Sequence, residues 1–255
     1  MTQWLGLPFD ASTHGAELDI VMMMVHLLMF ALFIGWGTFF GYTIWRFRKG
    51  RQPRAIYEGA QSHASTYLEA VLAGIEVVLL FGFSIPIWAS QINTLPDEKD
   101  AVVIHVVAQQ FTWKHHYAGA DGIFGRQEVA LVDEQSNPLG LDYKDEHALD
   151  DIVTGELHVP INKPVIVKVT SKDVIHGFGI PCLRVKQDAM PGMLVPVTFT
   201  AKKIGVFEIA CSQLCGLGHS NMKGIVVIET RSEFEKWATE QSASAKEINA
   251  SGGLF

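Results

Sequence analysis

The sequence lacks charge over long stretches, and these absences define its first half. Residues 1–19 contain no lysine or arginine, and the run from Ile20 to Trp45 contains no Asp, Glu, Lys or Arg. At about 1.5 Å per residue, this run exceeds the roughly 30 Å of a bilayer's hydrocarbon core. A second apolar run, Tyr67 to Trp88, has only Glu69 and Glu76 as charged residues. Because a buried hairpin of a soluble protein is rarely so long and apolar, we expect two membrane-spanning helices.

Further absences exclude classes of function. The net charge of −7, with no basic patch beyond residue 90, argues against nucleic-acid binding. The sequence contains no Cys-x-x-Cys-His motif, the signature of c-type haem attachment. Only three cysteines occur, and in an oxidising compartment they would ordinarily suggest one disulfide and one spare thiol.

Positive charge is concentrated between the two apolar runs. The positive-inside rule places this connection in the cytoplasm, and both termini therefore outside. The first run is too long and starts too late for a signal peptide, and no small-residue cleavage site follows it, so we expect it to remain as an anchor. The basic residues of the connection are Arg46, Arg48, Lys49, Arg51 and Arg54.

The changes in composition along the chain predict five segments. The polar stretch around Pro96 separates the apolar runs from a second half with a different pattern. We predict an external N-terminal segment at 1–19, a transmembrane helical hairpin at 20–90, a linker at 91–100, a β domain at 101–238 and a disordered Ser-, Ala- and Gly-rich tail at 239–255.

Short runs of β-branched residues, separated by glycine and proline, indicate that the second half is a β-sandwich. The sequence from Ser232 to Glu235 has the pattern of a capping box and predicts a brief final helix through Trp237. The expected strands lie at 101–107, 155–159, 164–169, 194–200, 206–210 and 224–228.

The segment between the last two expected strands has an unusual set of side chains. Cys211, Cys215, His219 and Met222 fall within twelve residues, and His176 stands upstream in another loop. Thiolate, thioether and imidazole groups together suit copper better than a hard cation. Zinc binds Cys₂His₂ sets, but methionine is not among its usual ligands. A Cys211–Cys215 disulfide is a further alternative, and it would leave the histidine and methionine without a role.

One early histidine followed by a late Cys/His/Met loop is typical of blue-copper sites. Here a second cysteine stands four residues before the usual one, so two bridging thiolates could hold two metals. Each metal would then have one imidazole, with Met222 as a weak ligand to one of them. Such a site has no obvious open coordination position, which favours electron transfer over the transformation of a substrate.

Over residues 18–238 the chain resembles subunit II of the haem–copper cytochrome c oxidases. The strongest motifs are Asp173–His176, Val185–Gly192 and the Cys211–Met222 loop. The resemblance implies a two-helix transmembrane hairpin followed by an all-β cupredoxin-like Greek-key sandwich. It also implies a binuclear copper centre bound by His176, Cys211, Cys215, His219, Met222 and the backbone carbonyl of Gln213.

The family's role would be to accept electrons from a c-type cytochrome and pass them to haem in subunit I. Oxygen is reduced there with proton pumping, so catalysis belongs to the complex, and subunit III is a further expected partner. We expect a bacterial plasma membrane, with the mitochondrial inner membrane as the alternative. A different class of function, a membrane-tethered copper carrier or chaperone, would use the same ligands.

The resemblance assigns roles to other positions as well. Glu69 matches a carboxylate at the entrance of a proton path, and Phe111 and Trp113 match the aromatic segment that receives electrons. Gln213 stands where many relatives have a glutamate that helps hold magnesium or manganese, and a neutral amide is a weaker ligand for such a cation. An acidic stretch could steer a basic cytochrome or be a merely solvated loop; it comprises Asp133, Glu134, Asp142, Asp145, Glu146, Asp150 and Asp151.

Overall fold

The computed structural model describes residues 6–55, 57–59, 61–93 and 95–250. It divides the chain into a helical unit, residues 17–93, and a β unit that comprises residues 6–16 and the chain beyond the helices. Residues 1–5 of the predicted external segment, Thr94 of the predicted linker and residues 251–255 of the predicted tail lie outside the described residues.

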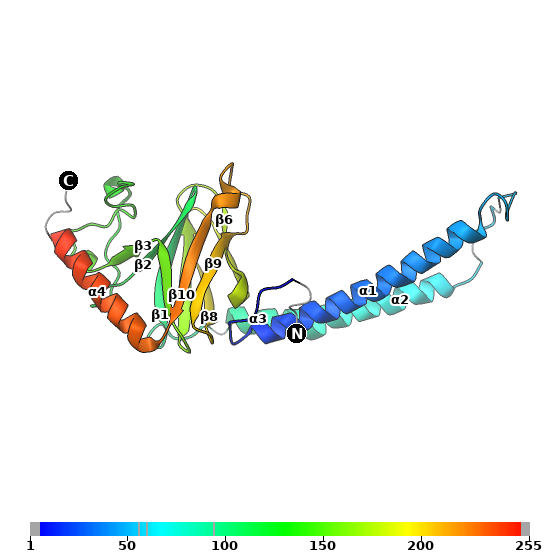
Figure 1. Ribbon diagram of the computed structural model, residues 1–255, viewed down its shortest axis with the longest axis horizontal. Helices are drawn as coiled ribbons and strands as arrows, with labels where there is room; N and C mark the ends of the chain where they lie inside the picture. The colour runs from blue at the N-terminus through cyan, green and yellow to red at the C-terminus, as the bar shows by residue number, and fades with distance from the viewer. Residues whose placement is uncertain (1–5, 56, 60, 94, 251–255) are drawn as a thin grey trace. The chain divides into compact units, whose positions relative to one another are not determined.

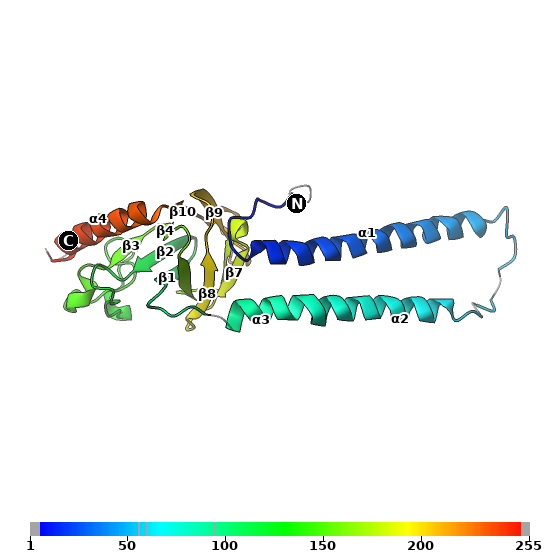
Figure 2. The same cartoon turned by 90° about the horizontal axis from the view of Figure 1, so that it is seen from below.

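The helical unit consists of the two predicted spans (Figure 2). The first is α1 (Gly15–Arg46); the second runs from α2 (Ala64–Val77) through a π-helical segment, η2 (Val78–Ser84), into α3 (Ile85–Asn93). Both are long and apolar enough to cross a membrane, and no residue of either most apolar stretch is buried within the chain. Apolar surface on all sides is typical of a helix whose solvent is lipid. The second span reaches Asn93, so the first residues of the predicted linker are helical.

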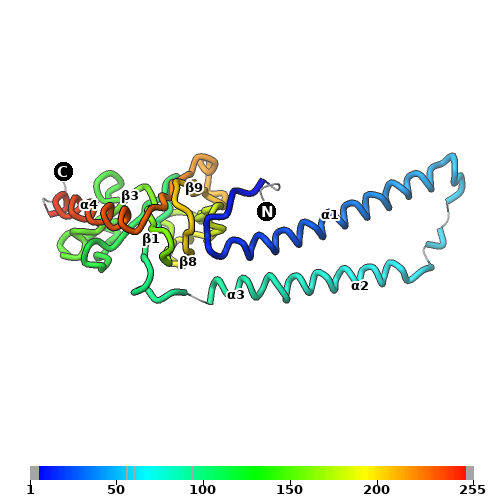
Figure 3. The backbone as a smooth tube through the Cα atoms, turned by 60° about the horizontal axis from the view of Figure 1, so that its bottom comes forward, coloured from blue at the N-terminus to red at the C-terminus, as the bar shows by residue number. Residues whose placement is uncertain are grey.

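The basic residues lie at the end of α1 and in the connection between the spans. Figure 3 shows the backbone of this connection. The guanidinium group of Arg51 lies 3.8 Å from the centroid of the Trp45 ring, and that of Arg48 lies 5.8 Å from it. Arg46 donates a hydrogen bond to Gln52 Oε1 at 3.1 Å. Two of the positive charges therefore lie beside Trp45 at the end of α1, where amphipathic rings favour the membrane interface.

The β unit is a sandwich of two five-stranded sheets (Figure 1). Each sheet contains one parallel pair, β1 with β5 and β4 with β10, and its other pairs are antiparallel. The first sheet has the order β3 (Ile152–Thr154), β2 (Thr112–Tyr117), β1 (Val102–Gln109), β5 (Pro164–Ser171), β8 (Val195–Thr200). The second has the order β4 (Glu156–Pro160), β10 (Lys223–Glu229), β9 (Gly205–Cys211), β6 (His176–Ile180), β7 (Val185–Ala189).

The core lies between the two sheets. Its largest fully buried side chains include Trp113, Phe178, Leu157 and Ile209, which come from strands of both sheets. Removing these side chains from water is the main favourable contribution to folding the sandwich. All six predicted strands are present, whereas β2, β3, β6 and β7 were not predicted. Short 3₁₀ turns occur at Val129–Leu131, Glu146–Ala148, Pro181–Leu183 and His219–Asn221.

Part of the predicted external N-terminal segment belongs to the sandwich. Ala11 N donates to Cys182 O at 2.7 Å, and Lys202 N donates to Ala11 O at 2.8 Å. Ser12 forms an antiparallel bridge with Ala201. Backbone hydrogen bonds therefore fix residues 11–13 beside the end of β8.

Three of the seven residues of the acidic stretch have a structural role, whereas Asp133, Glu134 and Glu146 are exposed. Asp142, Asp150 and Asp151 are buried, which neither a steering patch nor a solvated loop would require. Asp151 accepts hydrogen bonds from Gly125 N at 2.8 Å and from His116 Nε2 at 2.7 Å, and Asp150 accepts one from Ala120 N at 2.7 Å. These carboxylates satisfy backbone groups of the long connection between β2 and β3.

The predicted disordered tail is wrong for residues 239–250, because the final helix, α4 (Arg231–Ala250), continues through them. The helix is held at its far end by side chains that bond to the β2–β3 connection. Ser242 Oγ donates to Asp150 O at 3.0 Å, and Asn249 Nδ2 donates to Leu149 O at 3.1 Å. The capping box also lies two residues earlier than predicted, at Thr230 and Glu233 rather than Ser232 and Glu235. Glu233 N donates to Thr230 Oγ1, and Thr230 N donates to Glu233 Oε2.

Candidate metal centre

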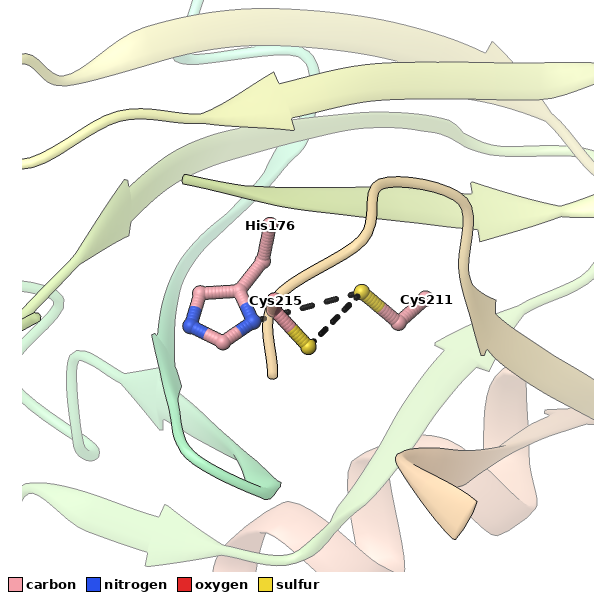
Figure 4. Close-up of side chains that lie close together, drawn as sticks. All are labelled: His176, Cys211 and Cys215. Carbon is pink, nitrogen blue, oxygen red and sulfur yellow. Dashed lines mark hydrogen bonds between the residues drawn. The ribbon is translucent and has the colours of Figure 1, made fainter. Parts of the chain in front are cut away.

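Two neighbouring strands of the second sheet bring the first two predicted ligands together. His176 is the first residue of β6 and Cys211 the last residue of β9, and Phe178 is paired with Cys211 in the register of these strands. Ser212 N donates to Gly177 O at 2.8 Å. A Cβ atom at Gly177 would lie 3.0 Å from the Ser212 backbone, so a glycine permits this close approach. The side chains of His176, Cys211 and Cys215 converge as a result (Figure 4).

The thiol of Cys215 is at the centre of the group. Its Sγ lies 3.8 Å from Cys211 Sγ, 3.6 Å from His219 Nδ1 and 3.8 Å from Met222 Sδ. Cys215 and Met222 are buried, whereas Cys211 and His219 are partly exposed. Cys211 N also donates to Met222 O at 3.2 Å, which fixes the two ends of the loop beside each other.

His176 is oriented by a carboxylate. Its Nδ1 lies 3.9 Å from Cys211 Sγ, and its Nε2 donates to Asp173 Oδ1 at 2.8 Å. The hydrogen bond to Asp173 requires a proton on Nε2, which leaves the lone pair of the neutral ring on Nδ1, facing the thiols. A carboxylate on the outer nitrogen is the usual partner of a metal-bound histidine.

A backbone oxygen completes the set of donor atoms. Gln213 O lies 3.1 Å from Cys211 Sγ, while the side chain of Gln213 is exposed. All six residues predicted as ligands therefore meet around two sulfur atoms. The group contains soft sulfur and imidazole donors and no carboxylate oxygen, which fits copper rather than magnesium or calcium.

The surroundings of Cys215 keep its thiol protonated in the absence of a metal. Burial, together with the neighbouring Cys211, raises the pKa of the Cys215 thiol to about 11. The thiol is therefore protonated at neutral pH unless a cation replaces the proton. Burial opposes the ionisation of Asp173, but the hydrogen bonds from Gln110 N and His176 outweigh it and hold the pKa of that carboxyl below its ordinary value.

The disulfide alternative does not describe this structure. Cys182, Cys211 and Cys215 are all free thiols. Cys182 lies away from the group, in the 3₁₀ turn before β7, where its carbonyl accepts the hydrogen bond from Ala11.

The two aromatic candidates occupy different places. Phe111 is 39% exposed and lies on the turn between β1 and β2, against Gly216 and Gly218 of the ligand loop. Trp113 is buried in the core, with its ring edge-on to His176 at a centroid distance of 6.2 Å. Of these two aromatic residues, Phe111 is therefore the one that a partner protein could contact. The candidate proton-path residue, Glu69, lies on α2 in the helical unit.

Sequence reasoning assigned no role to two residues that support the site. Asp173 begins the Asp173–His176 motif, and its spacing of three positions before His176 is the signal that could have identified it as the partner of the His176 ring. Gln110 donates from Nε2 to Cys215 O at 2.6 Å across 105 residues of sequence, and no local pattern marks that contact.

A family model described as cytochrome C oxidase subunit II, periplasmic domain, matches residues 102–230. The alternative cytochrome c oxidase subunit 2 of Bradyrhizobium diazoefficiens is 32% identical over 209 residues, which are 81% of this chain and 74% of that protein. The chain belongs to the cytochrome c oxidase subunit II family. Cytochrome c oxidase subunit 2 of Synechocystis is 27% identical to this subunit II over an alignment of 265 positions, gaps included, which covers 96% of the chain and 78% of that protein.

A crystal structure of the periplasmic domain of subunit II of cytochrome oxidase from Bradyrhizobium japonicum is similar over 59% of this chain and 99% of that chain, with 28% identity and a TM-score of 0.43. As a subunit II, the protein is part of a haem–copper terminal oxidase, an oxidoreductase complex. The predicted fold class is confirmed, and the family implies copper and electron transport. It is a membrane protein whose β-sandwich is the outward domain.

Proposed function

We propose that this subunit II holds two copper ions between the thiolates of Cys211 and Cys215 and carries electrons one at a time. The observation that supports it is the pair of unbonded sulfur atoms 3.8 Å apart, with an imidazole nitrogen beside each. The proposed ligands are His176, Cys211, Cys215, His219, Met222 and the backbone carbonyl of Gln213.

The side chains around the site have separate tasks. When bound, the copper pair supplies a one-electron carrier whose change of charge is shared by two metals. Asp173 holds the His176 ring in the tautomer that presents Nδ1. The buried Met222 and Trp113 exclude water from the inner side, which keeps the surroundings rigid and of low polarity when an electron arrives or leaves.

The proposed path begins at the exposed surface beside the ligand loop. Phe111, Leu214 and Leu217 are exposed apolar side chains around it, and such a group suits contact with another protein. We propose Phe111 as the contact for a c-type cytochrome, with Trp113 behind it in the core. The electron then passes to haem in subunit I, where oxygen is reduced to water with proton pumping. Subunit III is a further proposed partner.

Two other assignments concern protons and a second cation. We propose Glu69 as the entrance of a proton path, since a carboxylate within a membrane-spanning segment is a functional candidate by default. We assign no magnesium or manganese ion to the ligand loop. The Gln213 side chain is a neutral, exposed amide, which makes it a poor ligand for a hard cation.

The site also fits a membrane-tethered copper carrier or chaperone. Isolation of the full-length chain from its membrane, which we propose is a bacterial plasma membrane, separates these functions. Stable co-isolation with a haem-bearing subunit supports the oxidase. A chain that isolates alone and readily gives up copper to an acceptor protein supports the carrier.

The ligand assignment is tested with Cys215→Ser, and Cys182→Ser is the matched control because that thiol is buried away from the site. The parent and the control should bind two copper ions per chain and give an electron paramagnetic resonance spectrum with hyperfine lines from two equivalent nuclei. Cys215→Ser should lose that spectrum and oxidise cytochrome c slowly. A Cys215→Ser complex with the parental spectrum and rate would reject the assignment.

A further inference from the structure

The turn between β1 and β2 lies directly on the ligand loop. Gln110 Nε2 donates to the carbonyl oxygen of Cys215 at 2.6 Å. Cys215 is the residue whose sulfur lies beside Cys211, His219 and Met222. A displacement of the backbone at Cys215 would therefore move one sulfur relative to three other donor atoms.

The same glutamine is connected to the second ligand-bearing segment. Its backbone N–H donates to Asp173 Oδ2 at 2.7 Å, and the other oxygen of that carboxylate accepts the hydrogen bond from His176 Nε2. Gln110 thus links the loop that carries the cysteines to the loop that carries His176. The ligand loop and the β1–β2 turn are far apart in sequence, so this connection exists only in the folded sandwich.

The ligand loop has a backbone that needs such a restraint. Gly216 has φ +129°, a conformation that side-chain-bearing residues rarely adopt, and a glycine has little intrinsic preference that would hold it there. A Cβ atom at Gly216 would lie 2.8 Å from Gln110 Nε2, and one at Gly218 would lie 2.5 Å from the Phe111 ring. The bare backbone of the loop therefore lets the turn approach it closely, and the turn supplies the restraint.

We propose that Gln110 is a positioning residue of the metal centre, which holds the Cys215 peptide and joins the two ligand-bearing loops. The proposal rests on the proposed function for its effect on copper. Its effect on the loop does not depend on a bound metal. The neighbouring Gln109 is the natural comparison, because its side chain contacts Lys172 at 3.0 Å instead of the ligand loop.

The first measurement uses the full-length chain in detergent without metal. The rate at which N-ethylmaleimide labels Cys215 is followed by tandem mass spectrometry, with Cys211 in the same peptide as the internal reference. Gln110→Leu should label Cys215 about fivefold faster relative to Cys211, since losing one hydrogen bond of ordinary strength changes an opening equilibrium by about that factor. Gln109→Leu should label at the parental rate. Equal rates in Gln110→Leu and Gln109→Leu would overturn the proposal.

Two further variants separate the hydrogen bond from the bulk of the side chain. Gln110→Arg places an Nε–H the same number of bonds from the backbone, so it should restore the parental labelling rate. Gln110→Glu has the shape of glutamine, but its carboxylate cannot donate to a carbonyl, so it should behave as the leucine variant does. If Gln110→Leu does not fold, the labelling rate of Gln110→Glu tests the proposal in its place. Parental rates in Gln110→Glu would reject the hydrogen bond as the restraint.

The copper-loaded chain gives the second readout. Gln110→Leu should release copper to a cuprous chelator about fivefold faster than Gln109→Leu, with altered hyperfine splitting and equal initial copper content. An unchanged spectrum and release rate would remove Gln110 from the metal centre. If the parent chain itself shows no copper pair, the proposed function fails, and the labelling comparison still decides whether Gln110 holds the loop.

Discussion

At the scale of single residues, Asp173 accepts hydrogen bonds from both sides of the metal centre. Oδ1 accepts from His176 Nε2 at 2.8 Å, and Oδ2 accepts from Gln110 N at 2.7 Å. Asp173 is not among the residues whose donor atoms converge in the candidate metal group, His176, Cys211 and Cys215. In the proposed metal centre it would fix the His176 ring and make that ring a better donor.

Replacing Asp173 with alanine should therefore weaken copper binding without removing a ligand. We expect a 10–100-fold loss of affinity, roughly the effect of losing such a partner in other metal sites. Competition with a chelator of known affinity measures it. Asp188→Ala is the matched control, because Asp188 pairs with Lys186 on β7. If the two variants bound copper equally well, His176 would not depend on Asp173.

A buried histidine makes the sandwich sensitive to acid. His115 on β2 is fully buried, and burial lowers its pKa from 6.5 to about 3, although the nearby Thr154 backbone acts in the opposite direction. In the unfolded chain His115 binds a proton with a pKa near 6.5, whereas in the folded chain it stays neutral until the pH approaches 3. The contribution of neutral His115 to stability is therefore complete above pH 6.5 and is lost as the pH falls from 6.5 towards 3.

His115→Leu should reduce this acid sensitivity, because leucine does not titrate. Between pH 6.5 and 4, the free energy of unfolding of the parent should fall more steeply, by up to about 1.4 kcal/mol per pH unit. Hydrogen exchange of the β2 amides in the full-length chain measures the difference. Parallel pH dependences in the two proteins would show that His115 is protonated without unfolding.

At the scale of elements, local pattern predicted strands where β-branched residues dominate, as in β1 and β5. It did not predict β2, because Thr112–Tyr117 contains Lys114, His115 and His116, whose polarity hides two buried side chains. Nor did it predict β6, where Gly177 and Gly179 interrupt the run. In β6 the ligand loop needs the space that a side chain would take, so the requirement of the site overrides strand propensity.

The end of α4 was missed for a related reason. Serine, alanine and glycine suggested disorder, but alanine, lysine and glutamate in the same stretch are good helix formers. The helix is fixed by tertiary contacts that the sequence does not display. Ser242 is buried, donates to Asp150 O at 3.0 Å and accepts from Ala120 N at 3.1 Å.

Ser242→Ala should loosen the last turns of α4 and the β2–β3 connection together. The substitution removes the hydroxyl group that donates to Asp150 O, and the carbonyl loses this hydrogen bond. The free energy of unfolding should fall by about 1–3 kcal/mol as a result. Ser244→Ala, at an exposed position of the same helix, should lower the free energy of unfolding far less. The rates of amide hydrogen exchange at residues 118–125 and 239–250 are compared between the two variants. Equal rates in both would mean that Ser242 does not anchor the helix.

At the scale of the whole molecule, the proposed electron and proton functions occupy different units. The proposed copper ligands lie in the sandwich and Glu69 lies on α2. Most of the proposed metal site could be predicted from the sequence, because four of its side chains fall in one short loop. The hydrogen bonds that Asp173 and Gln110 make to the site could not be predicted, since they depend on how segments up to 105 residues apart meet in the fold. The sequence therefore identifies the candidate ligands, whereas the contacts that position them become visible only in the folded structure.

The orientation of the two spans is set by the basic connection between them. Five positive charges lie between Arg46 and Arg54, and the N-terminal segment has none, so the connection should remain in the cytoplasm. Trypsin should therefore cut this connection in inside-out vesicles and leave it intact in right-side-out vesicles. Changing all five residues to glutamine removes the charge difference and should give a mixed population, detected by maleimide labelling of Cys211 from either side. Cleavage of the parent from the outer side would reverse the assigned topology and would place the sandwich, with its proposed copper site, in the cytoplasm.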